Sequence, residues 1–289
     1  MSAAVQYLFS GLVNGSVYGL AALAIVLVFR VSGVVNLAQG DAITLGALLT
    51  VWLQVVWGLP LPVAALLAVA FTAALSVAFA ELAIRPARRR GASGMTIIFV
   101  TLALSVVSQG IGYLVGGADV QSEQPFLTAE PITVLGASLT WQSLLVIGTT
   151  VVVALALTWF FRMTLPGRAM TACAENPTGA VSLGITVRRM TALAFAGAGA
   201  LGGLSGVLLI PVISFSYQTG FGFGMQGLAA AAIVGMRSPL AALGGGVVIG
   251  CIGAFATGYL SSAYQIVIVS AVLAVALLCW PQLLGRQTV

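Results

Sequence analysis

Side chains that could carry chemistry are scarce in this chain of 289 residues, which has eleven arginines, six acidic residues and neither lysine nor histidine. Glycines starting at Gly197 and at Gly222 match the G-x-G-x-x-G pattern, but both matches lie in apolar sequence with no preceding strand, so no dinucleotide site is expected. A Walker A loop needs a lysine, which this chain lacks. We therefore expect no catalytic residue, no metal site and no cofactor.

The polar segment that ends at Asp41 is the best candidate for a functional site, because Asn36, Gln39 and Gly40 precede that carboxylate in apolar surroundings. An acid inside a membrane segment is functional by default, and Asp41 could serve an ion-coupled transporter. Glu81 is the other acid in an apolar segment, and an i, i+4 ion pair with Arg85 explains its presence there. Two local structures fit: either the span starts late, after Asp41, with residues 31–41 as an interfacial approach, or the helix breaks around Gly40 and its polar groups line a cavity.

Composition predicts that these residues lie in or between membrane helices. Hydrophobic residues make up 60% of the chain and charged residues 6%, against about 45–50% and about 25% in soluble domains. Eight apolar segments have about the length that a bilayer requires. They lie at 7–29, 33–56, 61–84, 95–116, 141–161, 191–213, 240–259 and 263–281. The prediction is an all-α polytopic bundle, with 222–236 as a short glycine-rich re-entrant or half-length segment.

Arginine placement predicts the orientation of this bundle. Arginines fill the linker after the third span and the loop at about 162–190, so both should be cytoplasmic, whereas the acidic loop at about 117–140 should be external. The N-terminus is then outside. Neither loop can hold a core, so residues 1–289 form a single transmembrane domain. The net charge of +5 is explained by membrane topology, and no nucleic-acid partner is expected.

Small residues recur at the spacing that lets helices pack closely in a membrane. Gly11, Gly15 and Gly19 form one such row, and two shorter rows are Gly202 with Gly206 and Gly246 with Gly250. Three cysteines lie far apart, so packing is expected of them and neither disulfides nor metal binding.

The loop from 166 to 189 reads PGRAMTACAENPTGAVSLGITVRR. It predicts two short helices separated at Asn176-Pro177, the second capped by Thr178 and ended by Gly184. Such a pair could dock a soluble partner, or it could be an ordinary solvated linker. Glu175 either pairs with an arginine of a partner or caps the second helix beside Asn176.

Three sequence blocks resemble a known family. The blocks NGSVYGLAALA at 14–24 and GVVNLAQGD at 33–41 are similar to the first two spans of the LivH-type permease of branched-chain amino acid ABC importers. The run RAMTACAENPTGAVSLGI at 168–185 resembles the family's coupling loop. The run GMRSPL at 235–240, followed by glycines up to 250, is similar to its C-terminal motif.

The resemblance implies the permease subunit of an importer in a bacterial inner membrane. The implied partners are a second related permease, two cytoplasmic ATPases and an extracytoplasmic solute-binding protein. The implied solute is a branched-chain or other hydrophobic amino acid, moved by alternating access. Gln39 and Asp41 stand where members commonly have histidine and glutamate, and Arg237 stands where a small residue is expected, which leaves other small polar solutes open. An ion-coupled secondary transporter using Asp41 is the alternative.

Two sets of residues are the predicted functional sites. Polar groups facing lipid would cost several kcal/mol each, so those of the first spans should line the solute path or its gate. The path set is Asn14, Asn36, Gln39 and Asp41. The second set should hold the ATPase: Arg168, Ala172, Glu175, Asn176, Pro177, Ala180 and Gly184.

Overall fold

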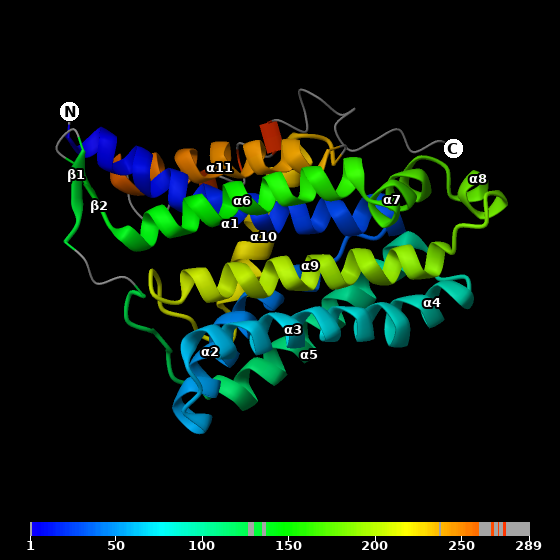
Figure 1. The fold of residues 1–289 in the computed structure, drawn as a ribbon, viewed down its shortest axis with the longest axis horizontal. Coiled ribbons are helices and arrows are strands. Elements are labelled where there is room, and N and C mark those ends of the chain that lie inside the picture. The colour runs from blue at the N-terminus through cyan, green and yellow to red at the C-terminus, as the bar shows by residue number, and fades with distance from the viewer. Residues whose placement is uncertain are drawn as a thin grey trace.

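The computed structural model describes residues 2–126, 130–134, 137–236 and 238–259, with 267–268, 271 and 274–275. Long helices dominate this part of the chain (Figure 1). They are α1 (Ser2–Ser32), α2 (Asp41–Trp57), α3 (Leu61–Phe79), α5 (Gly94–Gly116), α6 (Trp141–Met163), α9 (Val187–Leu209) and α11 (Pro239–Tyr259). The shorter elements are a 3₁₀ turn at Leu37–Gln39, a π-helical turn at Ala80–Ile84, α4 (Arg85–Arg89), α7 (Leu165–Glu175), α8 (Pro177–Ser182), α10 (Thr219–Ile233) and the hairpin of β1 (Ile132–Val134) with β2 (Ala137–Leu139).

Seven of the described helices are long and apolar enough to cross a membrane, which confirms the predicted helical membrane bundle. The predicted segment at 263–281 falls almost wholly outside the described residues. Helix α9 begins and ends four residues earlier than the predicted 191–213. Its early end has a local cause, because Pro211 cannot continue the ladder of helical hydrogen bonds.

The two ends of the bundle differ in charge, as predicted. The loop between α5 and α6 carries Asp119, Glu123 and Glu130, and it lies at the end where Gln6 of α1 meets Ser138 of β2. The described arginines lie at the opposite end, around α4, α7 and the start of α9 (Figure 1). We call these the acidic end and the arginine end.

Helix α1 occupies the centre and contacts α6, α9, α10 and α11. Residues 20–28 of α1 are all apolar and at most 4% exposed, so this part of the helix is apolar and buried on every face. Its glycine row packs closely on another helix, as predicted, and that helix is α11: a methyl group at Gly15 would lie 2.7 Å from the Cα of Val247, and one at Gly250 would overlap the backbone of Gly15. Gly206 of α9 packs equally closely on Ile43 of α2.

The glycine-rich segment at 222–236 is a short helix, as predicted. Helix α10 has 15 residues and is about 22 Å long at about 1.5 Å per residue, too short for a hydrocarbon layer of about 30 Å. Helix α9 ends at the acidic end, where the Glu123 N–H donates to the Ile210 carbonyl at 3.4 Å. Helix α11 begins at the arginine end, where Pro239 lines a cavity with Arg30 and Arg162. The chain from α9 to α11 therefore crosses the whole bundle, and α10 covers only part of that distance.

Candidate functional site

The predicted second span contains a break, which corrects its expected start at residue 33. Residues 33–36 are irregular, Leu37–Gln39 form a 3₁₀ turn and α2 begins only at Asp41. Asn36 causes the turn, because its side-chain oxygen accepts a hydrogen bond from the Ala38 N–H at 3.2 Å. The helix thus starts late, at Asp41, and the polar residues around its start are packed inside the bundle: Asn36 is 6% exposed, and Gln39 and Asp41 are 1% exposed.

Asp41 is held by side chains of α5. Ser105 donates its hydroxyl to one carboxylate oxygen, and Gln109 donates its side-chain amide to the other at 3.4 Å. Gln109 also donates to the Ser105 hydroxyl oxygen at 3.3 Å, so the three groups form one network. Ser105 and Gln109 were not among the residues predicted from the sequence. The sequence does contain a pattern that could have identified them, because the polar residues Thr101, Ser105 and Gln109 recur every four residues on one face of this apolar helix.

Gln39 faces α9. Its side-chain amide donates to the Ala198 carbonyl at 2.8 Å, whereas its side-chain oxygen has no partner in the described structure. The hydroxyl oxygen of Thr44, one turn into α2, also lacks a partner there. Two buried acceptors thus lie close to the break without a hydrogen bond, and such groups are costly unless something else satisfies them.

A second break meets the first. A methyl group at Gly40 would overlap the Gly220 carbonyl oxygen and lie 2.6 Å from the Cα of Gly224. One at Gly220 would overlap the Thr44 hydroxyl. The irregular stretch before α2 therefore crosses the start of α10 with backbone against backbone. Paired interrupted helices inside a bundle are how membrane transporters expose backbone and polar groups to a solute.

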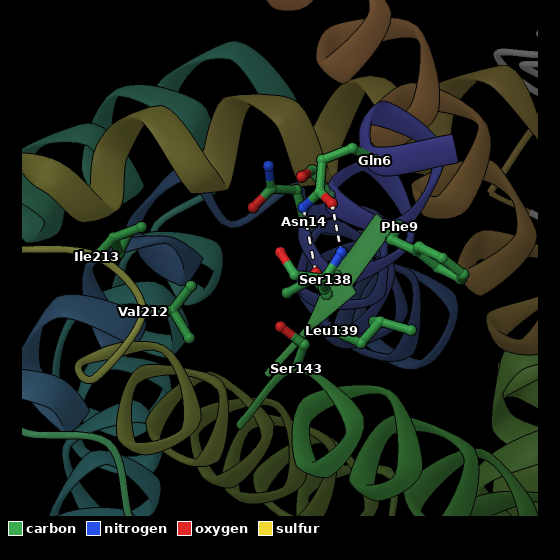
Figure 2. Close-up of a pocket in the computed structure, with 10 residues that line it drawn as sticks. Gln6, Phe9, Asn14, Ser138, Leu139, Ser143, Val212 and Ile213 are labelled. Atoms are coloured by element: carbon green, nitrogen blue, oxygen red, sulfur yellow. Dashed lines mark hydrogen bonds between the residues drawn. The ribbon is translucent and has the colours of Figure 1, made fainter. Parts of the chain in front are cut away.

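Asn14 lies apart from this cluster. It lines an open cavity of about 240 Å³ at the acidic end, beside Gln6, Ser10 and Ser143. Figure 2 shows Gln6 and Ser138 joined by two hydrogen bonds next to Asn14, with lengths of 3.3 and 2.9 Å. The structure thus brings Asn36, Gln39 and Asp41 together and places Asn14 in a separate polar cavity.

The predicted pair of short helices is confirmed in α7 and α8, which meet at Asn176-Pro177. The cap is a correction: Asn176 and not Thr178 caps α8, by accepting from the Gly179 N–H at 2.9 Å. Gly184 follows α8 with a φ of +77°, a left-handed conformation that favours glycine. Glu175 is the exposed last residue of α7.

One side of this helix pair is packed into the bundle. Met170, Cys173 and Ala180 are buried against Leu27 of α1 and Ala194 of α9. Burial also raises the pKa of the Cys173 thiol. Two alanines were among the residues predicted to hold the ATPase: Ala180 is buried and Ala172 is half-buried. Met170 was not predicted to have a role, and Cys173 was predicted only to pack, without this location.

The other side faces outward. Leu183 is 79% exposed and Val181 60% exposed, next to the exposed side chains of Glu175, Asn176 and Pro177. Arg168 is also exposed, and its guanidinium donates to the Arg162 carbonyl at 2.9 Å. The helix pair is therefore anchored in the bundle on one side and presents exposed hydrophobic surface on the other.

Glu81 links two helices near the arginine end. Its carboxylate pairs with Arg85 at 2.7 Å, which confirms the predicted i, i+4 pair, and with Arg188 of α9 at 3.0 Å. Across the described ranges, no three cysteine or acidic side chains gather as a metal-binding group would require.

Comparison with known proteins identifies the family. Residues 7–278 match the model of the permease component of branched-chain amino acid transport systems. The chain belongs to this family. It is 29% identical to the high-affinity branched-chain amino acid permease protein LivH of Salmonella typhimurium, over 99% of this chain and 96% of that protein. It is 28% identical to BraD of Pseudomonas aeruginosa, over 99% and 97% of the two chains.

The fold also matches a solved structure, PsaBC from Streptococcus pneumoniae in complex with Fab. The TM-score is 0.52 at 15% identity, over 94% of this chain and 91% of that chain. Family membership and the seven apolar helices make this permease a multi-pass membrane protein. None of these comparisons favours the ion-coupled alternative.

Proposed function

We propose that this permease is the membrane-spanning subunit of an ATP-binding-cassette importer in a bacterial inner membrane, with its N-terminus outside. Its solute is a branched-chain or other hydrophobic amino acid, because the similar LivH and BraD proteins are named for that transport. Its partners are a second related permease, two cytoplasmic ATPases and an extracytoplasmic solute-binding protein. Hydrolysis in the ATPases drives alternating access, and this chain contributes no catalytic group.

The helix pair α7–α8 carries the proposal. Closure of a soluble ATPase can move membrane helices only through a rigid element that both bodies hold. The pair has a buried side fixed to α1 and α9 and an exposed apolar tip at Val181 and Leu183. We call residues 165–184 the coupling loop. Arg168, Ala172, Glu175, Asn176, Pro177, Ala180 and Gly184 are its proposed functional residues.

The paired breaks mark the proposed path or gate. Asn36, Gln39 and Asp41 lie where two interrupted helices cross, and two acceptor atoms there have no protein partner among the described residues. A small solute or its water could satisfy such acceptors during passage. Asn14 lines the cavity at the acidic end, and we assign it to the entrance of the path.

The decisive test uses Glu175→Lys and Gly184→Val in the assembled complex. A lysine at 175 reverses the charge at the exposed end of α7, and a valine at 184 forces a β-branched residue into a left-handed conformation, at a cost of about 1–2 kcal/mol. Each should reduce co-purification of the ATPase and lower solute-stimulated ATP hydrolysis at least about tenfold, with the permease still inserted.

Matched controls exist for both changes. Glu130→Lys makes the same charge change on an exposed acid at the opposite end, and Gly91→Val introduces the same strain at a glycine with a φ of +75° outside the coupling loop. Both controls should retain the ATPase. Intact docking and hydrolysis in Glu175→Lys and Gly184→Val would show that α7–α8 is only a linker.

A further inference from the structure

A second cavity, of about 150 Å³, lies at the arginine end between four helices. Arg30 of α1, Arg162 of α6 and Thr171 of α7 line it, together with Ser238 and Pro239 at the start of α11. We call it the four-helix cavity. It is separate from the paired breaks and from the cavity that contains Asn14.

The charge of the four-helix cavity is uncompensated. Both ion pairs found in the described part of the chain involve Glu81, so neither Arg30 nor Arg162 has a carboxylate partner there. None of the described residues that line the cavity is acidic. Two guanidinium groups without a carboxylate partner are the usual surroundings of a phosphate, which accepts several hydrogen bonds at once.

The start of α11 adds further donors. The Ser238 hydroxyl oxygen accepts from the Ala241 N–H at 3.4 Å, which leaves its own hydrogen available to a ligand. The first turn of this 21-residue helix carries partial positive charge. The hydroxyl donor and the partial positive charge add to the two arginines, which make the main contacts with the anion.

The apolar part of the cavity wall indicates that the ligand is an amphiphile and not a free anion. Leu23, Leu157, Phe161 and Leu240 form its apolar part. Outside it, Val152, Leu155 and Trp159 are 63%, 65% and 63% exposed. Their spacing puts them on the same face of α6 as Arg162, so an exposed apolar stripe leads along the span to the arginine.

The size of the cavity fits a headgroup phosphate. A volume of 150 Å³ equals about five waters at about 30 Å³ each, enough for a phosphate group but not for a whole lipid. The acyl chains would therefore lie outside, along the apolar stripe of α6. A tryptophan near the end of such a stripe is typical of the membrane interface.

We propose that the four-helix cavity binds the phosphate group of an anionic phospholipid, whose acyl chains lie along α6. Arg30 and Arg162 contact the phosphate, and Ser238 donates to it. The bound lipid ties α7, the first helix of the coupling loop, to α1, α6 and α11. Basic cavities between membrane helices are known to take anionic headgroups in this way.

The test measures lipid retention by the purified full-length chain in detergent, using native mass spectrometry. The chain is titrated with phosphatidylglycerol, with phosphatidylcholine and with inorganic phosphate. We expect phosphatidylglycerol to bind at least about tenfold more tightly than phosphatidylcholine. The double variant Arg30→Gln with Arg162→Gln should lose most of that preference.

Two further variants isolate the cavity from general surface charge. Arg89→Gln with Arg90→Gln removes two exposed charges at the same end, outside the cavity, and should bind phosphatidylglycerol like the unaltered chain. Arg30→Lys with Arg162→Lys keeps the charge and should keep part of the affinity, which gives a measurement if the glutamine variant fails to fold.

Three results would overturn the proposal. Equal losses in the two glutamine pairs would mean attraction by surface charge alone. Displacement of phosphatidylglycerol by inorganic phosphate at similar concentrations would mean a free-anion site. Unchanged lipid binding in Arg30→Gln with Arg162→Gln, accompanied by loss of ATPase docking, would assign these arginines to a protein contact.

Discussion

Asp41 shows at the scale of a residue how this permease accommodates an acid among apolar helices. Ser105 and Gln109 of α5 hold its carboxylate, and the side chain is almost completely buried. Burying a charged or polar group is costly unless hydrogen bonds compensate for lost water. The network therefore keeps Asp41 in place at the point where α2 begins.

Substitution of Asn36 or Asp41 by alanine should impair uptake at least about tenfold while the complex still assembles. Loss of either side chain leaves donors unpaired, which costs about 1–3 kcal/mol. Uptake by reconstituted complexes, with assembly checked by size-exclusion chromatography, measures both effects. Ser105→Ala is the control for the network alone and should have the smaller effect on uptake. Normal uptake by both alanine variants would leave these residues a structural role only.

Cys173 should react slowly with thiol reagents. It is fully buried, and burial raises its pKa, so a smaller fraction is thiolate at any given pH and its reactivity rises only at higher pH than for an ordinary cysteine. Labelling with N-ethylmaleimide, located by peptide mass spectrometry, should be at least about tenfold slower than at an introduced Glu175→Cys. Equal rates at pH 7 would contradict the packing of α7 on α1 and α9.

At the scale of elements, the two interrupted spans depend on each other. Gly40 and Gly220 permit contact that any β-carbon would block, so the start of α10 fixes the start of α2. Three neighbouring positions of α10 can be compared directly. Gly220 and Gly224 face the break, whereas a methyl group at Gly222 would meet nothing within 4 Å.

Gly220→Ala should destabilise the permease by about 1–3 kcal/mol, the usual cost of overpacking. Gly222→Ala should be neutral or stabilise it by up to about 1 kcal/mol, since alanine favours the helix. Melting temperatures measured by thermal unfolding in detergent show which of the two variants is more stable. Equal melting temperatures would show that α10 does not pack on Gly40.

At the scale of the whole molecule, charge divides the bundle into two ends. The acidic loop and the N-terminal end of α1 lie together, and the described arginines lie opposite (Figure 1). Arginine-rich loops are retained on the cytoplasmic side. This orientation remains a prediction of the charge distribution.

Cysteines introduced beside Glu123 should react with a membrane-impermeant thiol reagent added outside intact cells, whereas cysteines beside Arg89 or Glu175 should react only after permeabilisation. The parent for this experiment lacks Cys173, Cys251 and Cys279, so that only the introduced thiol is measured. The reverse labelling pattern would invert the orientation without changing the helices.

The sequence alone determined the class of structure and the division of charge, because both follow from local features. Runs of about 20 apolar residues must form helices in a bilayer. The arginines divide the loops into a basic and an acidic group, and this division does not depend on how the helices pack. Asn176-Pro177 and Gly184 likewise predicted the coupling loop's two helices from backbone preferences alone.

Contacts between residues far apart in the chain depend on how the helices pack. The partners of Asp41 lie on α5, 64 and 68 residues along the chain, and the four-helix cavity joins residues from Leu23 to Leu240. Periodicity gives the face of one helix but not its neighbour, because every span is apolar and lipid and protein surfaces are chemically alike. Close packing between glycines, such as Gly40 against Gly220, determines which helices are neighbours.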